Sequence, residues 1–429
     1  MESALDSAFR TSVYASLNGE GEGSVNVRPG CKQPDELAIF GGRPLFEEKL
    51  HVGRPNIGDR DRFLACVNDI LDSRWLTNKG RYVDRFEREI EALLGLKHCI
   101  AMCNGTVALE IAVRALDLSG EVILPSFTFI ACAHALQWQR IKPVFCDVDP
   151  ATHNIDPARA ADMITPRTTG IMGVHLWGQA CDTDALAALA REHGLKVLYD
   201  ASHAFACSHG GRMIGGFGDA AVFSFHATKF INTLEGGAVV TDNDELAAKI
   251  RLMKNFGFSG MDNVIYIGTN GKMNEISAAM GLSGIGCLED IVAVNRRNYE
   301  AYQRGLANVP GLTVLRYDAR ERQNYQYVVT EIEETESGLS RDRLLEILHA
   351  ESVIARRYFY PGCHRMEPYR TLQPEAGSAL PETERLCARV MCLPTGTAVG
   401  ESDIDKICAL IASAVDRSSE INRRFQAHA

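Results

Sequence analysis

The sequence has no excess of positive charge. The 429-residue chain carries a formal net charge of −10. This balance argues against broad binding to nucleic acid or to an anionic membrane, because both need clustered basic surface. A few local Arg and Lys side chains are still enough to hold a phosphorylated ligand. We therefore expect any phosphate site to be local.

The cysteines lack the regular spacing of a disulfide framework, and their number, 13, is odd. The start MESALDSAFR also lacks the basic residues and apolar core of a signal peptide. We expect reduced thiols in a cytoplasmic protein. Cys99 with Cys103, and Cys207 with His209, have no matching second pair, so buried structural cysteine is favoured over a metal site, and no metal is expected.

No uninterrupted apolar run has the length of a membrane span. Residues 122–139 carry no formal charge, but Pro125, Ser126, Thr128 and His134 interrupt them. This stretch predicts a buried strand, a loop and a helix. No membrane partner is expected.

The composition that is present, 46% hydrophobic and 23% charged, is that of a globular protein with a large core. Residues 1–38 contain NGEGEGS and few large apolar side chains, so they are expected to form a mobile arm. We predict a large domain over residues 39–290 and a small domain over residues 291–429.

Short apolar runs alternate with helical patterns in the predicted large domain. Runs bounded by Gly, Pro or Asp predict strands at CIAMCN, EVILPSF, KPVFCDV, GIMGVHLW, LKVLYDA, DAAVFSF and GGAVVTD. Helix-like segments such as VALEIAVRALDL and TDALAALAREHG lie between them. The alternation predicts an α/β fold with a mainly parallel sheet. After residue 290, a long helix over 294–309 and a strand over 325–332 indicate a smaller α+β domain.

Polar residues follow two of the predicted strands. Asn104, Gly105 and Thr106 precede a helix, whose free N–H groups and dipole favour a phosphate; the alternative is simple helix capping. Asp200 follows a largely apolar run and is either a carboxylate aimed into a site or a turn residue.

The stretch FSFHATKFINTLEGGAVVTD places Lys229 between hydrophobic runs. A lysine there is costly to bury unless it reacts or pairs with an acid. Gly236 and Gly237 mark a close approach of the backbone before the next strand.

The motifs FSFHATK and EGGAVVTD, together with CNGTVALEIA, PSFTFIA, YDASHAFAC and GTNGKMNEISAAMG in this order, resemble the pyridoxal-phosphate-dependent sugar aminotransferases of the DegT/DnrJ/EryC1/StrS family. The resemblance covers roughly residues 40 to 425. It implies the type I fold of aspartate aminotransferase, with a large mainly parallel α/β domain and a small C-terminal α+β domain. It leaves the N-terminal arm outside the match.

The resemblance implies a role for each cofactor contact. Lys229 aligns with the lysine that bonds to the cofactor aldehyde and then acts as acid and base. Asp200 aligns with the carboxylate that keeps the pyridine nitrogen protonated. Phe129 aligns with the aromatic stacked on the ring, with core packing as the alternative. His203 aligns with a residue near the ring oxygen and phosphate side, with a structurally satisfied histidine as the alternative.

The resemblance also implies a homodimer with shared active sites. Gly105, Thr106 and Ser224 align with the phosphate cradle, and Asn270 aligns with a phosphate contact supplied by the neighbouring subunit. Many members have an aromatic residue in place of Gly271 and an arginine in place of Lys272. This sequence departs from the family pattern at both positions.

Two loops resemble substrate contacts of the family. WLTNKG, which contains Thr77 and Lys79, resembles the loop near the sugar. YPGCHRMEPY, which contains Tyr360 and His364, resembles the loop near the nucleotide. Structural loops would look the same, and Lys79 with its basic neighbours would equally form a solvated face.

His226 bears on which sugar carbon receives the amine. Members that act at carbon 4 tend to resemble FSFHATK with EGG, whereas carbon-3 enzymes more often resemble FSFYPTK with GDGG. The sequence therefore predicts transfer from L-glutamate to carbon 4 of dTDP-4-keto-6-deoxyglucose, for antibiotic or cell-surface aminosugars. The alternatives are a 3-keto sugar aminotransferase, a dehydratase, whose relatives have histidine in place of Lys229, and a non-catalytic regulator that binds the cofactor.

Overall fold

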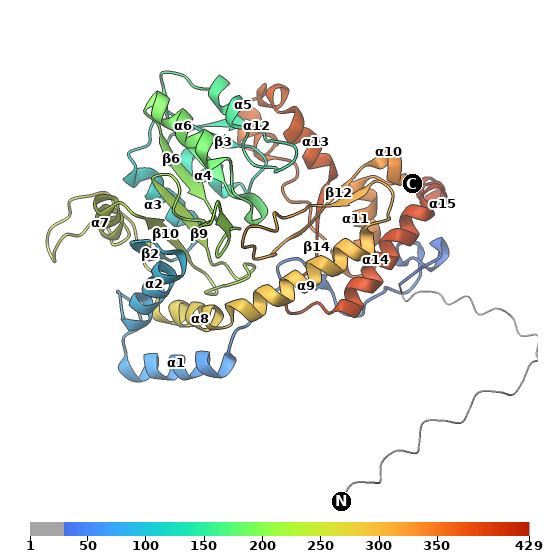
Figure 1. Cartoon of the computed structure of the whole chain (residues 1–429), viewed down its shortest axis with the longest axis horizontal. Helices are drawn as coiled ribbons and strands as arrows, with labels where there is room; N and C mark the ends of the chain where they lie inside the picture. Colours follow the sequence, from blue (N-terminus) through green and yellow to red (C-terminus); the bar gives the residue numbers. More distant parts are fainter. Residues whose placement is uncertain (1–29, 429) are drawn as a thin grey trace, which may run out of the picture.

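The central feature of the large domain is a seven-stranded sheet (Figure 1). The computed structural model describes residues 30–428. The strand order is β2 (His98–Met102), β10 (Gly237–Thr241), β9 (Ala220–Ser224), β6 (Lys196–Asp200), β5 (Thr168–Val174), β3 (Glu121–Pro125) and β4 (Lys142–Cys146). β10 pairs antiparallel with both β2 and β9, and the other neighbouring strands of this sheet pair in parallel. Each apolar run that predicted a strand forms one, which confirms the predicted sheet.

Both faces of this sheet are buried because successive strand residues point to opposite sides. In β2, Ile100 and Met102 join one apolar cluster with helices α3 (Gly105–Ala115) and α4 (Ala131–Gln137). Cys99 and Ala101 join a second cluster on the other face, with α2 (Arg81–Leu94), α6 (Thr183–His193) and α8 (Glu275–Gly286). The remaining elements of this region are α1 (Arg60–Ser73), α5 (Pro157–Asp162), α7 (Asp244–Met253), β7 (Ser208–His209), β8 (Arg212–Met213) and the short helix η3 (Leu176–Gly178).

A three-stranded antiparallel sheet organises the C-terminal region, in the order β11 (Leu312–Val314), β12 (Val328–Ile332) and β14 (Val390–Leu393). The longest helix, α9 (Leu288–Leu306), packs along α14 (Glu401–Asp416). The other elements here are α10 (Glu334–Ser337), α11 (Arg341–Ala350), β13 (Val353–Ile354), η4 (Cys363–Arg365), α12 (Tyr369–Leu372), η5 (Ala376–Ala379), α13 (Pro381–Arg389) and α15 (Ser418–His428).

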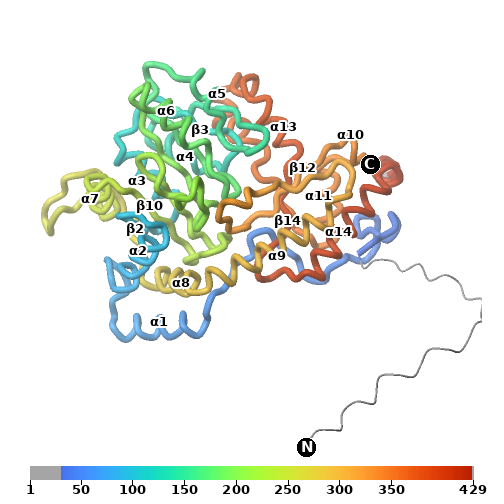
Figure 2. Tube along the Cα trace, in the orientation of Figure 1, coloured from blue at the N-terminus to red at the C-terminus, as the bar shows by residue number. Residues whose placement is uncertain are grey.

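The chain passes from one region to the other at the junction of α8 and α9, which are bent by 63° relative to each other. Figure 2 shows this path from the large sheet toward the C-terminal elements. The predicted boundary at residue 290 therefore falls inside α9, just after its start. Within residues 30–428 no single helix is long and apolar enough to cross a membrane, although α8 and α9 together meet the length and composition criteria.

Residues 30–51 pack on the small domain, which differs from the predicted division of the chain. Leu37 and Leu50 are buried in the apolar core of that domain, and β1 (Leu50–His51) pairs in parallel with β13. The buried Glu351 carboxylate accepts hydrogen bonds from Lys32 Nζ and from backbone N–H groups of this segment. The helices η1 (Pro34–Glu36) and η2 (Ala38–Phe40) lie within it. Most of the predicted arm, residues 1–29, lies outside the described residues.

Candidate active site

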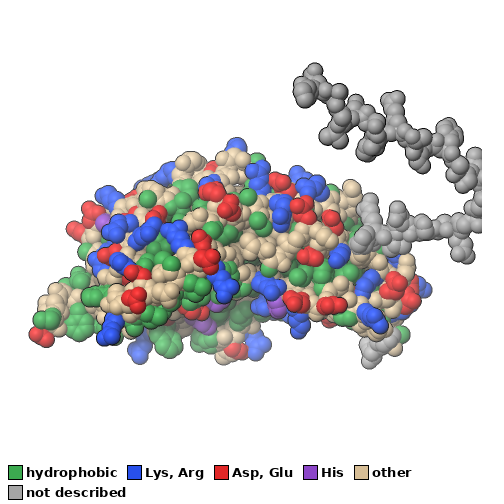
Figure 3. All heavy atoms as spheres, turned by 90° about the horizontal axis from the view of Figure 1, so that it is seen from below, with side chains coloured by type: hydrophobic (Ala, Val, Ile, Leu, Met, Phe, Trp, Pro, Cys, Tyr) green, Lys and Arg blue, Asp and Glu red, His purple; other side chains and the backbone are tan. Residues whose placement is uncertain are grey.

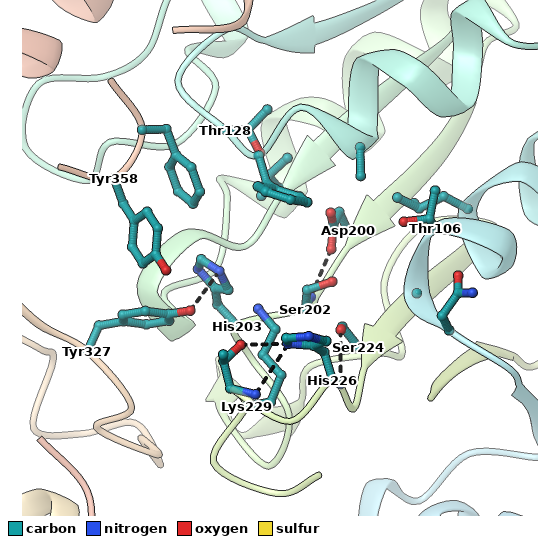
Figure 4. A pocket seen from close by; sticks show the side chains of 18 of the residues that line it. Thr106, Thr128, Asp200, Ser202, His203, Ser224, His226, Lys229, Tyr327 and Tyr358 are labelled. Atoms are coloured by element: carbon teal, nitrogen blue, oxygen red, sulfur yellow. Dashed lines mark hydrogen bonds between the residues drawn. The ribbon is translucent and has the colours of Figure 1, made fainter. Parts of the chain in front are cut away.

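A cavity of about 430 Å³ lies where strands of the large sheet end (Figure 4). β6 ends at Asp200, β9 ends at Ser224, and α3 begins at Gly105 after β2. In open α/β sheets, ligands bind in the crevice beyond these carboxyl ends. The cavity is lined by Val52, Asn104, Gly105, Thr106, Leu109, Thr128, Phe129, Ala131, Val174, Asp200, Ser202, His203, Ser224, His226, Thr228, Lys229, Glu235, Tyr327, Arg356, Tyr358 and Phe359.

Lys229 follows β9 in a turn, and its N–H donates to the carbonyl oxygen of His226 at 2.8 Å. Within residues 30–428, its Nζ has no hydrogen bond or ion pair. Burial lowers the pKa of Lys229 to about 8, although Asp200 and Cys132 act in the opposite direction. Figure 4 shows the side chain pointing toward the space between Asp200 and His203. An unpaired amine with a lowered pKa is suited to nucleophilic and proton-transfer chemistry.

The Asp200 carboxylate is held from two sides and is only 6% exposed. Its Oδ1 accepts a hydrogen bond from the backbone N–H of Ser202 at 2.9 Å. Its Oδ2 accepts one from Cys132 Sγ at 3.0 Å. Burial, then the charge of Asp200, raises the pKa of the Cys132 thiol well above its ordinary value, so the thiol keeps the proton that it donates. These bonds fix the direction of the carboxylate.

The start of α3 forms a second part of the cavity. Asn104 caps the helix, and its Oδ1 accepts from the N–H of Val107 at 2.8 Å. The N–H groups of Gly105 and Thr106 precede the first helical hydrogen bonds, so they remain available to an anion. A Cβ on Gly105 would lie 3.1 Å from Ser224 Cβ, and one on Gly237 would lie 2.7 Å from the Asn104 carbonyl carbon. Glycine at these positions therefore brings β9 and β10 close to the helix start.

The Phe129 ring is 58% exposed and lines the cavity. The alternative that Phe129 simply packs in the core is therefore wrong. An exposed ring at this place offers a flat apolar surface for another ring.

His203 lines the cavity and is 7% exposed. Its Nδ1 accepts from the backbone N–H of Trp177 at 3.3 Å, and its Nε2 lies 3.2 Å from Tyr327 Oη. Burial, then the charge of Lys229, holds the pKa of His203 well below its ordinary value. The imidazole is therefore neutral and has a partner at each ring nitrogen.

His226 lies at the edge of the same cavity and is exposed. Its Nδ1 lies 2.9 Å from Thr228 Oγ1, and its Nε2 lies 3.6 Å from Glu235 Oε1. The two motifs around HATK and EGG are thus in contact through these side chains. The side chains of His226, Thr228 and Glu235 thus form one polar cluster beside Lys229.

The remaining predicted site residues do not line this cavity. Thr77, Lys79 and Asn270 are exposed; Asn270 forms an isolated backbone bridge with Asn255. Tyr360 is 44% exposed, with the guanidinium of Arg357 over its ring.

His364 is buried away from the cavity. Its Nδ1 lies 2.7 Å from Ser126 Oγ, and its Nε2 lies 2.7 Å from Glu384 Oε1. These contacts explain its place in the fold, and they leave neither ring nitrogen for a ligand in this cavity.

Several lining residues were not predicted from the sequence. The predicted nucleotide loop began at Tyr360, whereas Arg356, Tyr358 and Phe359, directly before it, are the ones that line the cavity. The basic and aromatic run RRYFY was the available signal. Tyr327 lies in the predicted strand over 325–332, where the sequence pattern predicts an ordinary core side chain.

The cysteines and acids of residues 30–428 form neither a disulfide bond nor a metal site. All 13 cysteines are free thiols. Among residues 30–428, no group of His, Cys, Asp and Glu side chains is arranged to hold a metal ion.

Comparisons with known proteins agree with this geometry. Residues 58–412 match the model of the DegT/DnrJ/EryC1/StrS aminotransferase family. The dTDP-4-amino-4,6-dideoxy-D-glucose transaminase of Shigella dysenteriae is 35% identical over 366 residues, which are 85% of this chain and 99% of that protein. GDP-perosamine synthase of Caulobacter vibrioides is 34% identical over 369 residues, 85% of this chain and 97% of that protein.

A solved structure is similar over nearly the whole chain. The crystal structure of DesI, determined in the presence of its TDP-sugar product, aligns with a TM-score of 0.88 and 48% identity. The alignment covers 92% of this chain and 100% of that chain. By its sequence motifs, its fold and these similarities, the chain belongs to the DegT/DnrJ/EryC1/StrS aminotransferase family.

Proposed function

We propose that this protein is a pyridoxal-phosphate-dependent transaminase that moves an amino group from L-glutamate to carbon 4 of dTDP-4-keto-6-deoxyglucose. The observation that carries the proposal is the unpaired Lys229 amine, which shares one cavity with the fixed Asp200 carboxylate and the exposed Phe129 ring. A non-catalytic protein that held the cofactor through the same amine would form no 2-oxoglutarate from glutamate, whereas a transaminase forms it.

The side chains present fit each chemical part of the cofactor. Lys229 supplies an amine for the aldehyde, Asp200 a carboxylate for the pyridine nitrogen, and Phe129 a flat apolar face for the ring. The α3 N–H groups and Ser224 supply donors for the phosphate. When bound, pyridoxal phosphate carries the amino group between the two substrates and accepts the electrons left when a carbon-bound proton departs.

This chain's own residues account for the proton transfers. Lys229 takes a proton from the substrate carbon and returns one, because its lowered pKa of about 8 allows both the neutral and the charged form near neutral pH. Asp200 stays directed by Ser202 and Cys132, and its negative charge favours a protonated ring nitrogen. His203 is neutral, so it adds no positive charge that would compete with that of Lys229.

The choice of carbon 4 rests on the cluster beside Lys229 and on the relatives. Moving the reacting ketone by one ring carbon requires another pose of the whole sugar, so side chains next to the amine select it. His226, held near Thr228 and Glu235, occupies that position. The similar transaminase of Shigella dysenteriae is named for a 4-amino dTDP-sugar. A GDP-perosamine synthase is also similar to this chain. The substrate experiment therefore compares dTDP-linked with GDP-linked sugars.

We further propose that two subunits share each site. Thr77, Lys79 and Asn270 are exposed and lie outside this chain's own cavity, as expected of residues that act on a partner's site. The loop that contains Asn270 also exposes Phe256, Met261 and Ile267, the last two at 93% and 74%. It protrudes in Figure 1 beyond α7, and hydrophobic side chains gather at that end in Figure 3. An apolar protrusion of this kind is typical of an interface.

Subunit sharing is tested by mixing two impaired variants. Lys229→Ala and Asn270→Ala chains are purified separately and allowed to exchange subunits. We expect part of the activity to return, because a mixed dimer has one site free of both changes. No return of activity after demonstrated exchange contradicts the sharing.

The substrate is tested by offering matched dTDP-linked and GDP-linked sugars with a keto group at carbon 4 or carbon 3, together with glutamate. We expect 2-oxoglutarate and a sugar with nitrogen at carbon 4 by NMR, from the dTDP-linked 4-keto sugar. Efficient amination at carbon 3 contradicts the carbon-4 assignment. A GDP-sugar preference contradicts the nucleotide.

A further inference from the structure

The two ring nitrogens of His203 are both engaged by protein groups. Trp177 donates its backbone N–H to Nδ1 at 3.3 Å, and Tyr327 Oη lies 3.2 Å from Nε2. A backbone N–H can only donate, so Nδ1 is the acceptor. The imidazole is neutral, because burial and Lys229 lower its pKa. Its single hydrogen must therefore be on Nε2 and must point at the Tyr327 oxygen.

This arrangement leaves the hydroxyl hydrogen of Tyr327 free to be donated elsewhere. Burial raises the pKa of Tyr327 well above its ordinary value, so the hydroxyl keeps its hydrogen. Among residues 30–428, His203 is the only hydrogen-bond partner of Tyr327 Oη. Tyr327 lines the cavity, and Figure 4 shows its hydroxyl beside His203 on the side of Lys229. The cavity thus contains a donor that no protein group uses.

Aromatic packing keeps the His203 ring in this orientation. Trp177 stacks on His203, with ring centroids 5.7 Å apart, and on Phe359, at 5.5 Å. Trp177 Nε1 in turn donates to the buried His153 Nδ1 at 3.1 Å. Rotating the imidazole to offer Nε2 to a ligand would break the bond to Trp177 or the bond to Tyr327.

We propose that Tyr327 donates its hydroxyl hydrogen to the ring oxygen of the bound cofactor, and that His203 acts as a positioning residue by directing that hydroxyl. This inference rests on the cofactor of the proposed function. In pyridoxal phosphate, the ring oxygen is next to the aldehyde carbon that Lys229 bonds, and Lys229 lies close enough to His203 to affect its pKa. A partly negative oxygen there is a strong acceptor for a neutral hydroxyl.

The test is a pH titration of the visible absorbance of cofactor-loaded protein. A donor to the ring oxygen favours its anionic form, so removing the donor raises the pH at which the bound cofactor loses its proton. We expect Tyr327→Phe to raise this midpoint by about one pH unit, the effect of one hydrogen bond to a charged oxygen. The matched control is Tyr302→Phe, since Tyr302 is also buried and its hydroxyl donates to the Pro394 carbonyl oxygen, outside the cavity. The control should leave the midpoint unchanged.

Two variants separate the positioning residue from the donor. In His203→Gln, the amide oxygen can accept from Trp177 and the amide nitrogen can donate to Tyr327, so the midpoint should stay near that of the wild type. In His203→Leu, the hydroxyl loses its partner, and we expect a rise no larger than that of Tyr327→Phe.

An unchanged midpoint in cofactor-loaded Tyr327→Phe overturns the proposal. So does a rise in His203→Leu that exceeds the rise in Tyr327→Phe, because the imidazole would then be the donor. A wild-type chain that gains no visible absorbance from pyridoxal phosphate contradicts the proposed function and this inference together. The first two outcomes leave the proposed function intact.

Discussion

Two lysines of the large domain, Lys229 and Lys254, differ in whether their amines have a bonding partner. Lys254 is 8% exposed, and its Nζ donates to Glu87 Oε1 and to the Ala101 carbonyl oxygen, each at 3.1 Å. Lys229 Nζ has no such partner within residues 30–428. Burial lowers the pKa of both amines, and a nearby carboxylate opposes the shift at each, Glu87 at Lys254 and Asp200 at Lys229, but only Lys254 is hydrogen-bonded to its carboxylate. The comparison shows that the partner decides whether a buried amine stabilises the fold or remains free for chemistry.

Removing the unpaired Lys229 amine is expected to have the largest effect on activity. We expect Lys229→Ala to lose at least about 10²–10⁴-fold in transamination rate, the usual effect of an acid–base group. The melting temperature should not fall, because no hydrogen bond or ion pair of Lys229 Nζ is lost. Activity assays and thermal unfolding measure the two effects. Lys249→Ala is the control, since Lys249 pairs with Asp117 on the surface; a similar rate loss there would contradict the assignment.

The paired lysine is tested through its partner. Glu87→Gln removes the buried carboxylate that Lys254 and Arg251 share, and we expect the free energy of unfolding to fall by about 3–5 kcal/mol. Glu89→Gln on the same helix is the control, because its exposed pair with Arg85 is worth about 1 kcal/mol or less. Denaturant unfolding measures both, and equal losses would contradict the contrast.

The pH dependence of the free energy of unfolding provides a second test of the Glu87 ion pairs. Burial raises the pKa of Glu87, but Lys254 and Arg251 outweigh this effect, so the pKa is lowered overall. The stabilisation from a lowered carboxyl pKa is present above the unfolded value and is lost as the pH falls through the folded value. The difference in the free energy of unfolding between wild type and Glu87→Gln should therefore become smaller as the pH falls, which denaturant unfolding at several pH values measures.

The charge beside the free amine can be removed without removing the amine. Asp200→Asn keeps the shape and the Ser202 bond but lacks the negative charge, so we expect the cofactor to bind and the rate to fall by about 10²-fold. Absorbance with cofactor and steady-state assays measure the two effects. A rate near that of the wild type would make Asp200 a structural residue only.

The smallest expected effect concerns the rate of cofactor capture by the cofactor-free chain. The neutral amine is the nucleophile, so capture should become faster as the pH rises through about 8, the lowered pKa of Lys229. A surface lysine would give a midpoint near its ordinary value of about 10.4. Stopped-flow absorbance measures the rate, and a midpoint above about 10 would contradict the lowered pKa.

The sequence was sufficient to predict the sheet and the motifs of the site, because these depend on local patterns. Continuous apolar runs bounded by Gly, Pro or Asp mark strands buried on both faces, and strand ends place Asp200, Ser224 and Lys229 at one edge. Gly237 could be recognised as a close backbone approach for the same reason.

Other features could not be predicted, because they depend on contacts between distant segments. The bonds from Cys132 to Asp200 and from Tyr327 to His203 join residues with no periodic signal between them. The packing of Leu37 and Leu50 on the small domain likewise depends on β13 and Glu351, hundreds of residues away. His364, which resembled a loop residue, is buried because Ser126 and Glu384 bond to it.

The most direct test of the contrast between the two lysines is borohydride reduction of the cofactor-loaded protein, followed by peptide mapping. Reduction fixes the bond between the cofactor and whichever amine holds it. We expect the pyridoxyl group on Lys229 and none on Lys254, because Lys254 remains bonded to Glu87. A pyridoxyl group on another lysine, with Lys229→Ala still active, would contradict the account.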